Sequence, residues 1–110
     1  MTYIHKELAE GKWFTMSLTE QLGNIGSEVG RARIYQQKND ARLHDAAARA
    51  LELFDLTLSD GRWRGRLKEI GRARDVFCDA ISGGTEYSST LLSLENYFLY
   101  FAIAARLHVH

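Results

Sequence analysis

The chain has 110 residues, 45% of them hydrophobic and 25% charged, which fits one ordinary globular domain with a single modest core. Fourteen basic and fourteen acidic residues give zero net charge, so a surface for nucleic acid or a membrane could arise only from an uneven distribution of charge. One cysteine excludes an internal disulfide, no apolar run could span a bilayer, and the N-terminus lacks a signal-peptide pattern, so we expect a cytoplasmic protein with no membrane partner.

Residues 1–16 are expected to form an extension ahead of the main helices. Residues 7–11 can form a short helix, and Trp13 with Phe14 is expected to pack across one end of the domain. The first long helix is predicted to begin at Ser17, because Glu20 three residues later completes a capping box. Apolar residues then recur at alternating steps of four and three, as on one face of a helix, at Leu18, Leu22, Ile25, Val29 and Ala32.

Three glycines interrupt this first helix, at Gly23, Gly26 and Gly30. Each glycine inside a helix costs roughly 0.8–1 kcal/mol relative to alanine. Gly23 and Gly30 form a narrow strip of small residues with Ser27, and Gly26 lies near the apolar stripe. Because small residues let two helix backbones approach closely, we expect a close helix contact here. Loose packing or a kink is the alternative.

Three further helices follow, in a chain that contains no proline to interrupt them. The second is expected from Asn39 or Asp40 to Leu58, the third from about residue 61 to the Ser-Gly-Gly sequence at 82–84, and the fourth from residues 87–90 to about 107. We therefore predict an all-α fold, an up-down-up-down four-helix bundle over residues 17–107, in one domain spanning residues 1–110. The residues expected in its core are Leu22, Ile25, Val29, Ala50, Phe54, Leu67, Ile70, Phe77, Leu94, Phe98 and Phe101.

The fourth helix is apolar on two sides. Its main stripe is expected to face the core, whereas Leu92, Leu99 and Ile103 lie on nearly the opposite side. A monomer rarely leaves such a patch in water, so we expect a homo-oligomer built mainly through this helix, with a dimer favoured by symmetry. The alternative is a monomer in which residues 1–16 fold back over the second stripe.

The beginning of the third helix is rich in basic residues. Arg64, Lys68 and Arg72 follow one another at steps of four and form a basic ridge on the outward face. Such a ridge could follow the phosphates of RNA or single-stranded DNA, or it could be a solvated face paired with nearby acids. Arg74 falls on the apolar side instead and needs an acidic partner from a neighbouring helix. The candidates for this partner are Glu28, Asp45 and Glu52.

The titratable residues predict no metal centre, no cofactor, no small-molecule ligand and no catalytic group. His108 and His110 stand at the C-terminal end without further implied ligands, and His5 and His44 do not complete a site. Cys78 is expected to be an inert thiol beside an apolar stripe. Two carboxylate pairs resemble those that hold magnesium in all-helical nucleotide pyrophosphohydrolases, but we interpret them as ordinary exposed acids, because the first lies outside the core helices and the second is a common pattern on exposed helix faces. These pairs are Glu7 with Glu10 and Glu52 with Asp55.

The segments EQLGNIGSEVGR (residues 20–31) and RALELFDLTL (residues 49–58) resemble the 23S rRNA intervening-sequence protein family. The matching positions are Asn24, Ile25, Glu28, Gly30 and Arg31. This resemblance, which extends to the accessory variability proteins of diversity-generating retroelements, implies a four-helix bundle, a ring-like pentamer, and nucleic acid or a reverse transcriptase as partner. From WFTMSL (13–18) through GRLKE (65–69) to YFLYFA (97–102), the chain also resembles a small bacterial family of unassigned function.

These observations favour a non-catalytic oligomeric accessory or adaptor protein that contacts nucleic acid, or an enzyme acting on nucleic acid, through the basic ridge. One alternative is a purely protein-binding bundle. Another is a metal-independent ribonuclease of the HEPN type, in which Arg106 and His108 or His110 would act across a dimer. HEPN ribonucleases carry an Arg-x(4–6)-His motif, and the spacing from Arg106 to either histidine is shorter.

Overall fold

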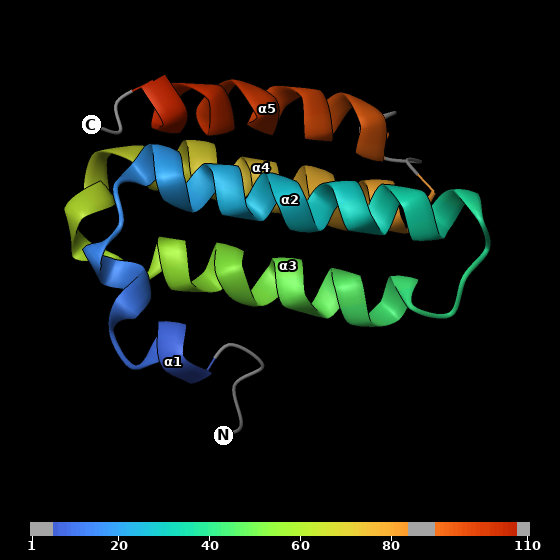
Figure 1. Ribbon diagram of the computed structural model, residues 1–110, viewed down its shortest axis with the longest axis horizontal. Coiled ribbons are helices and arrows are strands. Elements are labelled where there is room, and N and C mark those ends of the chain that lie inside the picture. Colours follow the sequence, from blue (N-terminus) through green and yellow to red (C-terminus); the bar gives the residue numbers. More distant parts are fainter. Residues whose placement is uncertain (1–5, 84–89, 108–110) are drawn as a thin grey trace.

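The computed structural model describes residues 6–83 and 90–107, and within these ranges every regular element is a helix. The four long helices, α2 to α5, alternate in direction along the chain (Figure 1), which confirms the predicted all-α four-helix bundle. The elements in chain order are α1 (Lys6–Ala9), the 3₁₀ helix η1 (Lys12–Thr15), α2 (Leu18–Gln37), α3 (Leu43–Leu58), the 3₁₀ helix η2 (Gly61–Arg66), α4 (Leu67–Ile81) and α5 (Leu91–Leu107).

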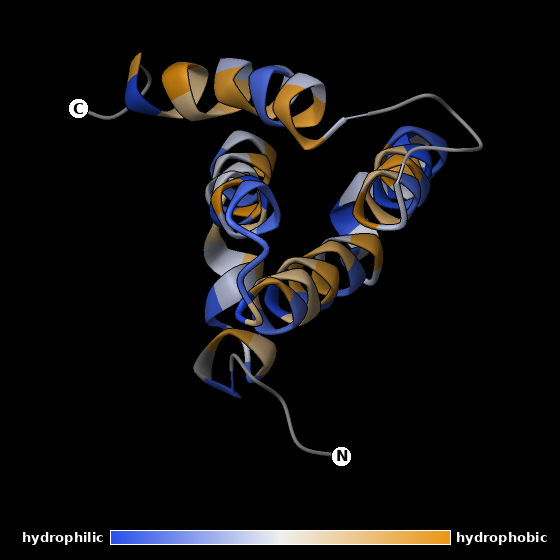
Figure 2. Cartoon of the chain, turned by 90° about the vertical axis from the view of Figure 1, so that its right-hand side faces the viewer, coloured by the Kyte–Doolittle hydropathy of each residue, from blue (hydrophilic) through white to orange (hydrophobic). Residues whose placement is uncertain are grey.

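The long helices pack as neighbours around the bundle: α2 contacts α3 and α5, α3 contacts α4, and α4 contacts α5. Helix α5 crosses α2 obliquely. Figure 2 shows α2 nearly end-on, whereas α5, which lies next to the mark for the C-terminus, is seen along its length. In the described part of the chain, no helix is both long enough and apolar enough to cross a membrane.

The core consists of side chains from all four long helices around three aromatic rings. The ring of Phe54 lies 5.9 Å from that of Phe77 and 5.8 Å from that of Phe98, between ring centroids. All the predicted core residues are buried except two. Phe101 is half-buried and packs against the core. The prediction is wrong for Leu67, which is 39% exposed because it is the first residue of α4.

The beginnings of α2 and α3 test the helix starts that the sequence predicts. Ser17 caps α2, and the predicted capping box with Glu20 is present. The predicted start of the second helix at Asn39 or Asp40 is wrong, since α3 begins at Leu43. The carboxylate of Asp40 instead accepts the backbone N–H of Arg42 (2.8 Å) in the preceding turn.

The third predicted helix is divided in two. Residues 61–66 form the 3₁₀ helix η2, Trp63 has non-helical backbone angles, and α4 begins only at Leu67. Two glycines, Gly61 and Gly65, weaken the α-helical preference of this segment. Asp60 also favours a tight first turn, because its side chain accepts the backbone N–H of Arg62.

A network of buried polar side chains joins the N-terminal segment to one end of the bundle. The indole N–H of Trp13 donates to the hydroxyl of Thr57 (3.0 Å), and that of Trp63 donates to the amide oxygen of Gln21 (2.8 Å). The amide nitrogen of Gln21 donates to the backbone oxygen of Trp13 (2.9 Å) and to the carboxylate of Asp60 (3.2 Å). Gln21 therefore ties η1, α2 and the turn between α3 and η2 together.

The carboxylate of Asp60 is the charged member of this network. It accepts three hydrogen bonds from the guanidinium group of Arg62, at 2.7, 3.0 and 3.2 Å, and it is almost fully buried. The hydrogen bonds from Arg62 lower the pKa of Asp60 to about 2. Arg62 also donates to the backbone oxygen of Met16 (2.7 Å) and lies over the ring of Trp63. One ion pair thus clamps the N-terminal segment onto the turn before η2.

The glycines of α2 lie against α5, which confirms the predicted close helix contact. A Cβ atom added to Gly26 would lie 2.6 Å from the Cβ of Phe98, closer than two carbon atoms can approach without movement. A Cβ on Gly23 would lie 3.1 Å from the Cα of Ala102. Helix α5 therefore packs directly on the backbone of α2 (Figure 1).

We predict that Gly26→Ala lowers the free energy of unfolding by roughly 1–3 kcal/mol, because the added methyl group overpacks the contact with Phe98. Gly71 in α4 provides the matched control, since a Cβ there would meet open space. Gly71→Ala is expected to raise the stability by about 0.4–1 kcal/mol. Urea unfolding followed by circular dichroism measures both changes, and a shift in the same direction for both variants would contradict the close contact.

We also predict an acid-sensitive contribution from Asp60. Because its folded pKa of about 2 lies below the ordinary 3.8, the carboxylate stabilises the fold above about pH 4, and this contribution is lost as the pH falls towards 2. Asp60→Asn should cost roughly 1–3 kcal/mol at pH 7 and flatten the decline of stability in acid.

Asp40→Asn is the control for this acid titration. Arg42 also lowers the pKa of Asp40 to about 2, but this pair lies at the surface turn between α2 and α3, where solvent screens it. Urea unfolding between pH 7 and pH 2 should therefore show a smaller loss for Asp40→Asn than for Asp60→Asn. Equal losses would mean that burial of the Asp60 pair contributes nothing.

Candidate functional site

The surface of α5 that faces away from the core exposes large apolar side chains. We call this surface the outer α5 face. Figure 2 shows the hydrophobic colour along much of α5, which lies at the edge of the bundle. The two most exposed side chains are Tyr100 (78%) and Leu107 (75%). The face consists of Leu92, Leu99, Tyr100, Ile103 and Leu107.

Residues 6–16 of the N-terminal segment do not cover this face. Within residues 6–16, η1 contacts α3, and Trp13 is buried beside Thr57. Trp13 and Phe14 pack at the end of the bundle, as the sequence predicts. The alternative in which this segment folds back over the second stripe of the fourth helix is therefore wrong for residues 6–16. Trp13 and Phe14 pack against the core instead, and Trp13 also belongs to the polar network.

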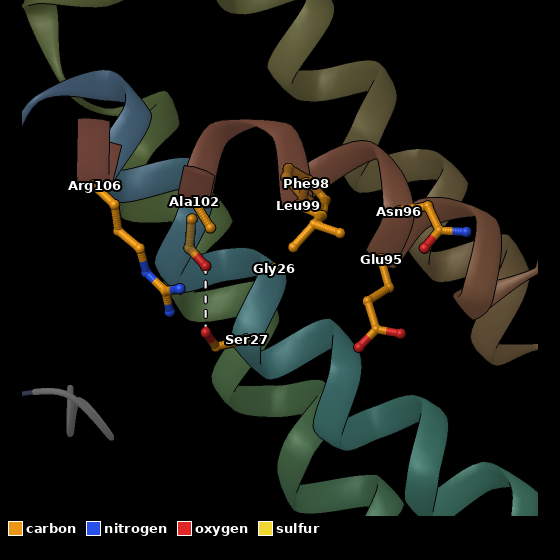
Figure 3. Close-up of a pocket in the computed structure, with 9 residues that line it drawn as sticks. Gly26, Ser27, Glu95, Asn96, Phe98, Leu99, Ala102 and Arg106 are labelled. Carbon is orange, nitrogen blue, oxygen red and sulfur yellow. Dashed lines mark hydrogen bonds between the residues drawn. The ribbon is translucent and has the colours of Figure 1, made fainter. Parts of the chain in front are cut away.

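A groove of about 400 Å³ runs along the line where α5 crosses α2, beside the outer α5 face (Figure 3). We call it the glycine groove. On the α2 side it is lined by Gly23, Gly26 and Ser27, whose hydroxyl donates to the backbone oxygen of Gly23 (3.4 Å). On the α5 side, Leu99 and Ala102 line it. The groove exists because glycines leave space that side chains would otherwise fill.

The glycine groove carries opposite charges at its two ends. Glu95 lies at one end and Arg106 at the other, and Figure 3 shows both side chains pointing towards α2. Glu95 accepts a hydrogen bond of 2.6 Å from Nε of Arg33 and is about one-third exposed. Arg106 is exposed and makes no ion pair with any residue in the ranges 6–83 and 90–107. The acidic end of the groove is thus paired within the chain, whereas Arg106 at the other end has no acidic partner among residues 6–83 and 90–107.

The predicted basic ridge is exposed, but it is not one helical row. Arg64 lies in η2, while Lys68 and Arg72 lie one turn apart on α4, and all three side chains are exposed. The 3₁₀ geometry of η2 advances about 120° per residue, so the step of four from Arg64 to Lys68 does not keep both on one face. The predicted outward orientation is confirmed, and the predicted alignment at steps of four is wrong for Arg64.

Several neighbouring cations are engaged in ion pairs. Arg66 binds Glu69 (2.9 Å), next to the ridge. Arg74 binds Asp55 on α3 (2.8 Å), an acid that is not among its three predicted partners. The predicted partners Glu28, Asp45 and Glu52 are therefore wrong. Glu28 is buried and binds Arg31 (2.6 Å) and Arg49 (3.3 Å) instead, which joins α2 to α3.

A smaller, mostly apolar cavity of about 220 Å³ lies between α4 and α5. The hydroxyl of Tyr97 donates to Glu69 at 2.9 Å beside it. Burial and this hydrogen bond to a carboxylate raise the pKa of Tyr97 to about 12, and the guanidinium group of Arg66 holds the pKa of Glu69 below its ordinary value. These contacts attach α5 to α4 and leave no group there poised for acid–base chemistry near neutral pH.

The remaining candidate ligands do not converge. In the part of the chain that the structure describes, no group of three His, Cys, Asp or Glu side chains could hold a metal ion. Cys78 is half-buried, and Nη1 of Arg74 lies 4.0 Å from its sulfur. Asp55 is bound to Arg74 and His44 is exposed. The histidines at 5, 108 and 110 and the side chain of Glu7 lie outside the described residues.

Sequence reasoning missed the polar network and the charged ends of the groove. Gln21 and Glu28 are seven residues apart on the flank of the apolar stripe of α2, and this pattern of polar residues beside a core face was the available signal for buried polar contacts. The pair formed by Arg33 and Glu95 had no such signal, because it depends on how α5 crosses α2.

No family model, no curated protein and no solved structure matches this chain.

Proposed function

We propose that this protein is a non-catalytic oligomeric adaptor that assembles with copies of itself through the outer α5 face. The observation that carries the proposal is the exposure of Leu99, Tyr100 and Ile103, together with Leu92 and Leu107, along one side of a single helix. A monomer gains nothing from leaving five large apolar side chains in water, whereas an interface that buries them gains from every one.

The composition of the face also supports an interface between proteins. It combines aliphatic side chains with one tyrosine, and the exposed polar residue beside it, Asn96, is uncharged. Interface cores favour aromatic and apolar residues and are depleted of charge. Around this core, Glu95 and Arg106 supply a charged rim.

A second proposed contact is to an acidic partner, with RNA or single-stranded DNA as the class that the exposed ridge fits best. It is supported by Arg64 and Lys68, which extend into solvent while their neighbours Arg62 and Arg66 are bound to acids of the same chain. A reverse-transcriptase-like enzyme with an acidic surface would meet the same charges. Contacts of this kind rest on phosphate or carboxylate charge and weaken as salt rises.

For the assembly, we predict that Leu99→Glu shifts the protein to a monomer, because a charged group would have to be buried at the centre of the interface. Leu67→Glu on α4 is the matched control, since Leu67 is also an exposed leucine but lies outside the outer α5 face. Light scattering at micromolar concentration reports the mass of each variant. A parent protein that is already monomeric would contradict the proposal.

For the acidic partner, we predict that replacing Arg64, Lys68 and Arg72 by glutamine lowers the affinity for RNA or single-stranded DNA at least tenfold at low salt, and reduces the slope of log K against log salt by about two to three. The melting temperature should change little, because the three side chains are exposed. A titration series at rising salt measures both quantities. Equal binding by the parent and the variant, or no binding by either, would remove this contact from the proposed function.

A further inference from the structure

Four of the five residues of the outer α5 face are equally spaced in both directions along the helix, and the fifth, Ile103, is matched by an uncharged residue, Asn96. Counted outwards from the point between Leu99 and Tyr100, Asn96 is matched by Ile103, and Leu92 is matched by Leu107. A two-fold axis through that point would place each residue opposite its match in a second, antiparallel copy. Every large apolar side chain would then have an apolar or uncharged neighbour across the axis.

The two charged residues beside this face are also placed so that an antiparallel copy would bring opposite charges together. Glu95 and Arg106 are eleven residues apart, which is close to three full turns, so both lie on one flank of α5, the flank that faces the glycine groove (Figure 3). In an antiparallel pair related by a two-fold axis, equal flanks of the two helices meet. Arg106 of one copy would then lie within about two residues of Glu95 in the other, near 3 Å along the axis, a distance that an arginine side chain spans. Oε1 of Glu95 accepts from Arg33 of its own chain, so Arg106 would bind the second carboxylate oxygen, Oε2.

A parallel pair would not use these charges. There the flank with Glu95 and Arg106 would meet the opposite flank of the second helix, which carries Ser93 and Tyr100 and no charged residue. Arg106 would remain without an acidic partner, as it is within the described residues of the single chain. The antiparallel arrangement satisfies both the apolar spacing and the charges, and it closes the open side of each glycine groove.

We infer that the occupant of the outer α5 face is α5 of a second copy, antiparallel about a two-fold axis between Leu99 and Tyr100, with Arg106 of each copy bound to Glu95 of the other. This inference rests on the proposed function, because it specifies the geometry of the same assembly. It makes the dimer closed and isologous, so that both copies use one surface and no edge remains for further addition.

Cysteine cross-linking tests the direction of the pair. In a Cys78→Ser parent, which removes the native thiol, single cysteines are introduced as Leu92→Cys, Leu99→Cys or Leu107→Cys. In the antiparallel dimer Leu99 lies close to the axis and should link to its own copy on mild oxidation. Leu92 would be about 22 Å from its own copy along the helix axis, too far for a disulfide, but opposite Leu107. Leu92→Cys should therefore link only when it is mixed with Leu107→Cys.

Charge reversal tests the ion pairs. Arg106→Glu should weaken the dimer by roughly three- to thirtyfold, because two exposed pairs become like-charge contacts. Arg64→Glu is the matched control, since it makes the same change at an exposed position in η2 and should leave the dissociation constant unchanged. Sedimentation equilibrium measures both constants, and circular dichroism confirms that the variants are folded.

The outcomes separate this inference from the proposed function. A dimer in which Leu92→Cys links to its own copy is parallel and overturns the inference while the proposed assembly stands. A dimer or larger oligomer in which none of the three cysteines links, or in which Arg106→Glu behaves like Arg64→Glu, also overturns it. A parent protein that sediments as a monomer overturns both.

Discussion

The contact between the glycines of α2 and the inner face of α5 determines how the rest of the bundle is arranged. Gly26 receives Phe98, and Gly23 receives the backbone of α5 at Ala102, so the two helices meet without intervening side chains on the α2 side. This approach places the ring of Phe98 against Phe54 in the core. It also turns Leu99 and Ile103 outwards, because they lie about 100° and about 140° around the helix axis from Phe98.

At the end of the bundle where the N-terminal segment packs, buried polar side chains hold the structure together. Gln21 lies fully buried and joins Trp13, Trp63 and Asp60, and the charge of Asp60 is balanced by Arg62. Buried polar groups of this kind are costly unless all of them are paired, and among the described residues all of them are. Residues 6–16 of the extension are consequently a part of the fold and do not cover the outer α5 face.

The number and order of the long helices could be predicted from the sequence, because apolar spacing reports which side of a helix is buried. The same spacing identified Leu92 and Leu99 as a second, exposed stripe. The start of α4 could not be predicted, since residues 61–66 form a 3₁₀ helix capped by a hydrogen bond from the N–H of Arg62 to Asp60, and apolar spacing does not report such a contact. Nor could the partner of Arg74 be predicted, because which acid lies opposite is set by the crossing of α3 and α4. Spacing within one helix carries no information about such crossings.

The two sides of α5 are subject to different limits on sequence change. On the inner side, the close packing at Gly26 allows little variation, because any larger residue there displaces Phe98. On the outer side, Tyr100 and Leu107 contribute almost nothing to the core and are largely exposed. Substitutions on that side change the exposed surface while the bundle keeps its stability. A lineage of such chains could therefore vary this surface without passing through unfolded intermediates, as long as the glycines remain.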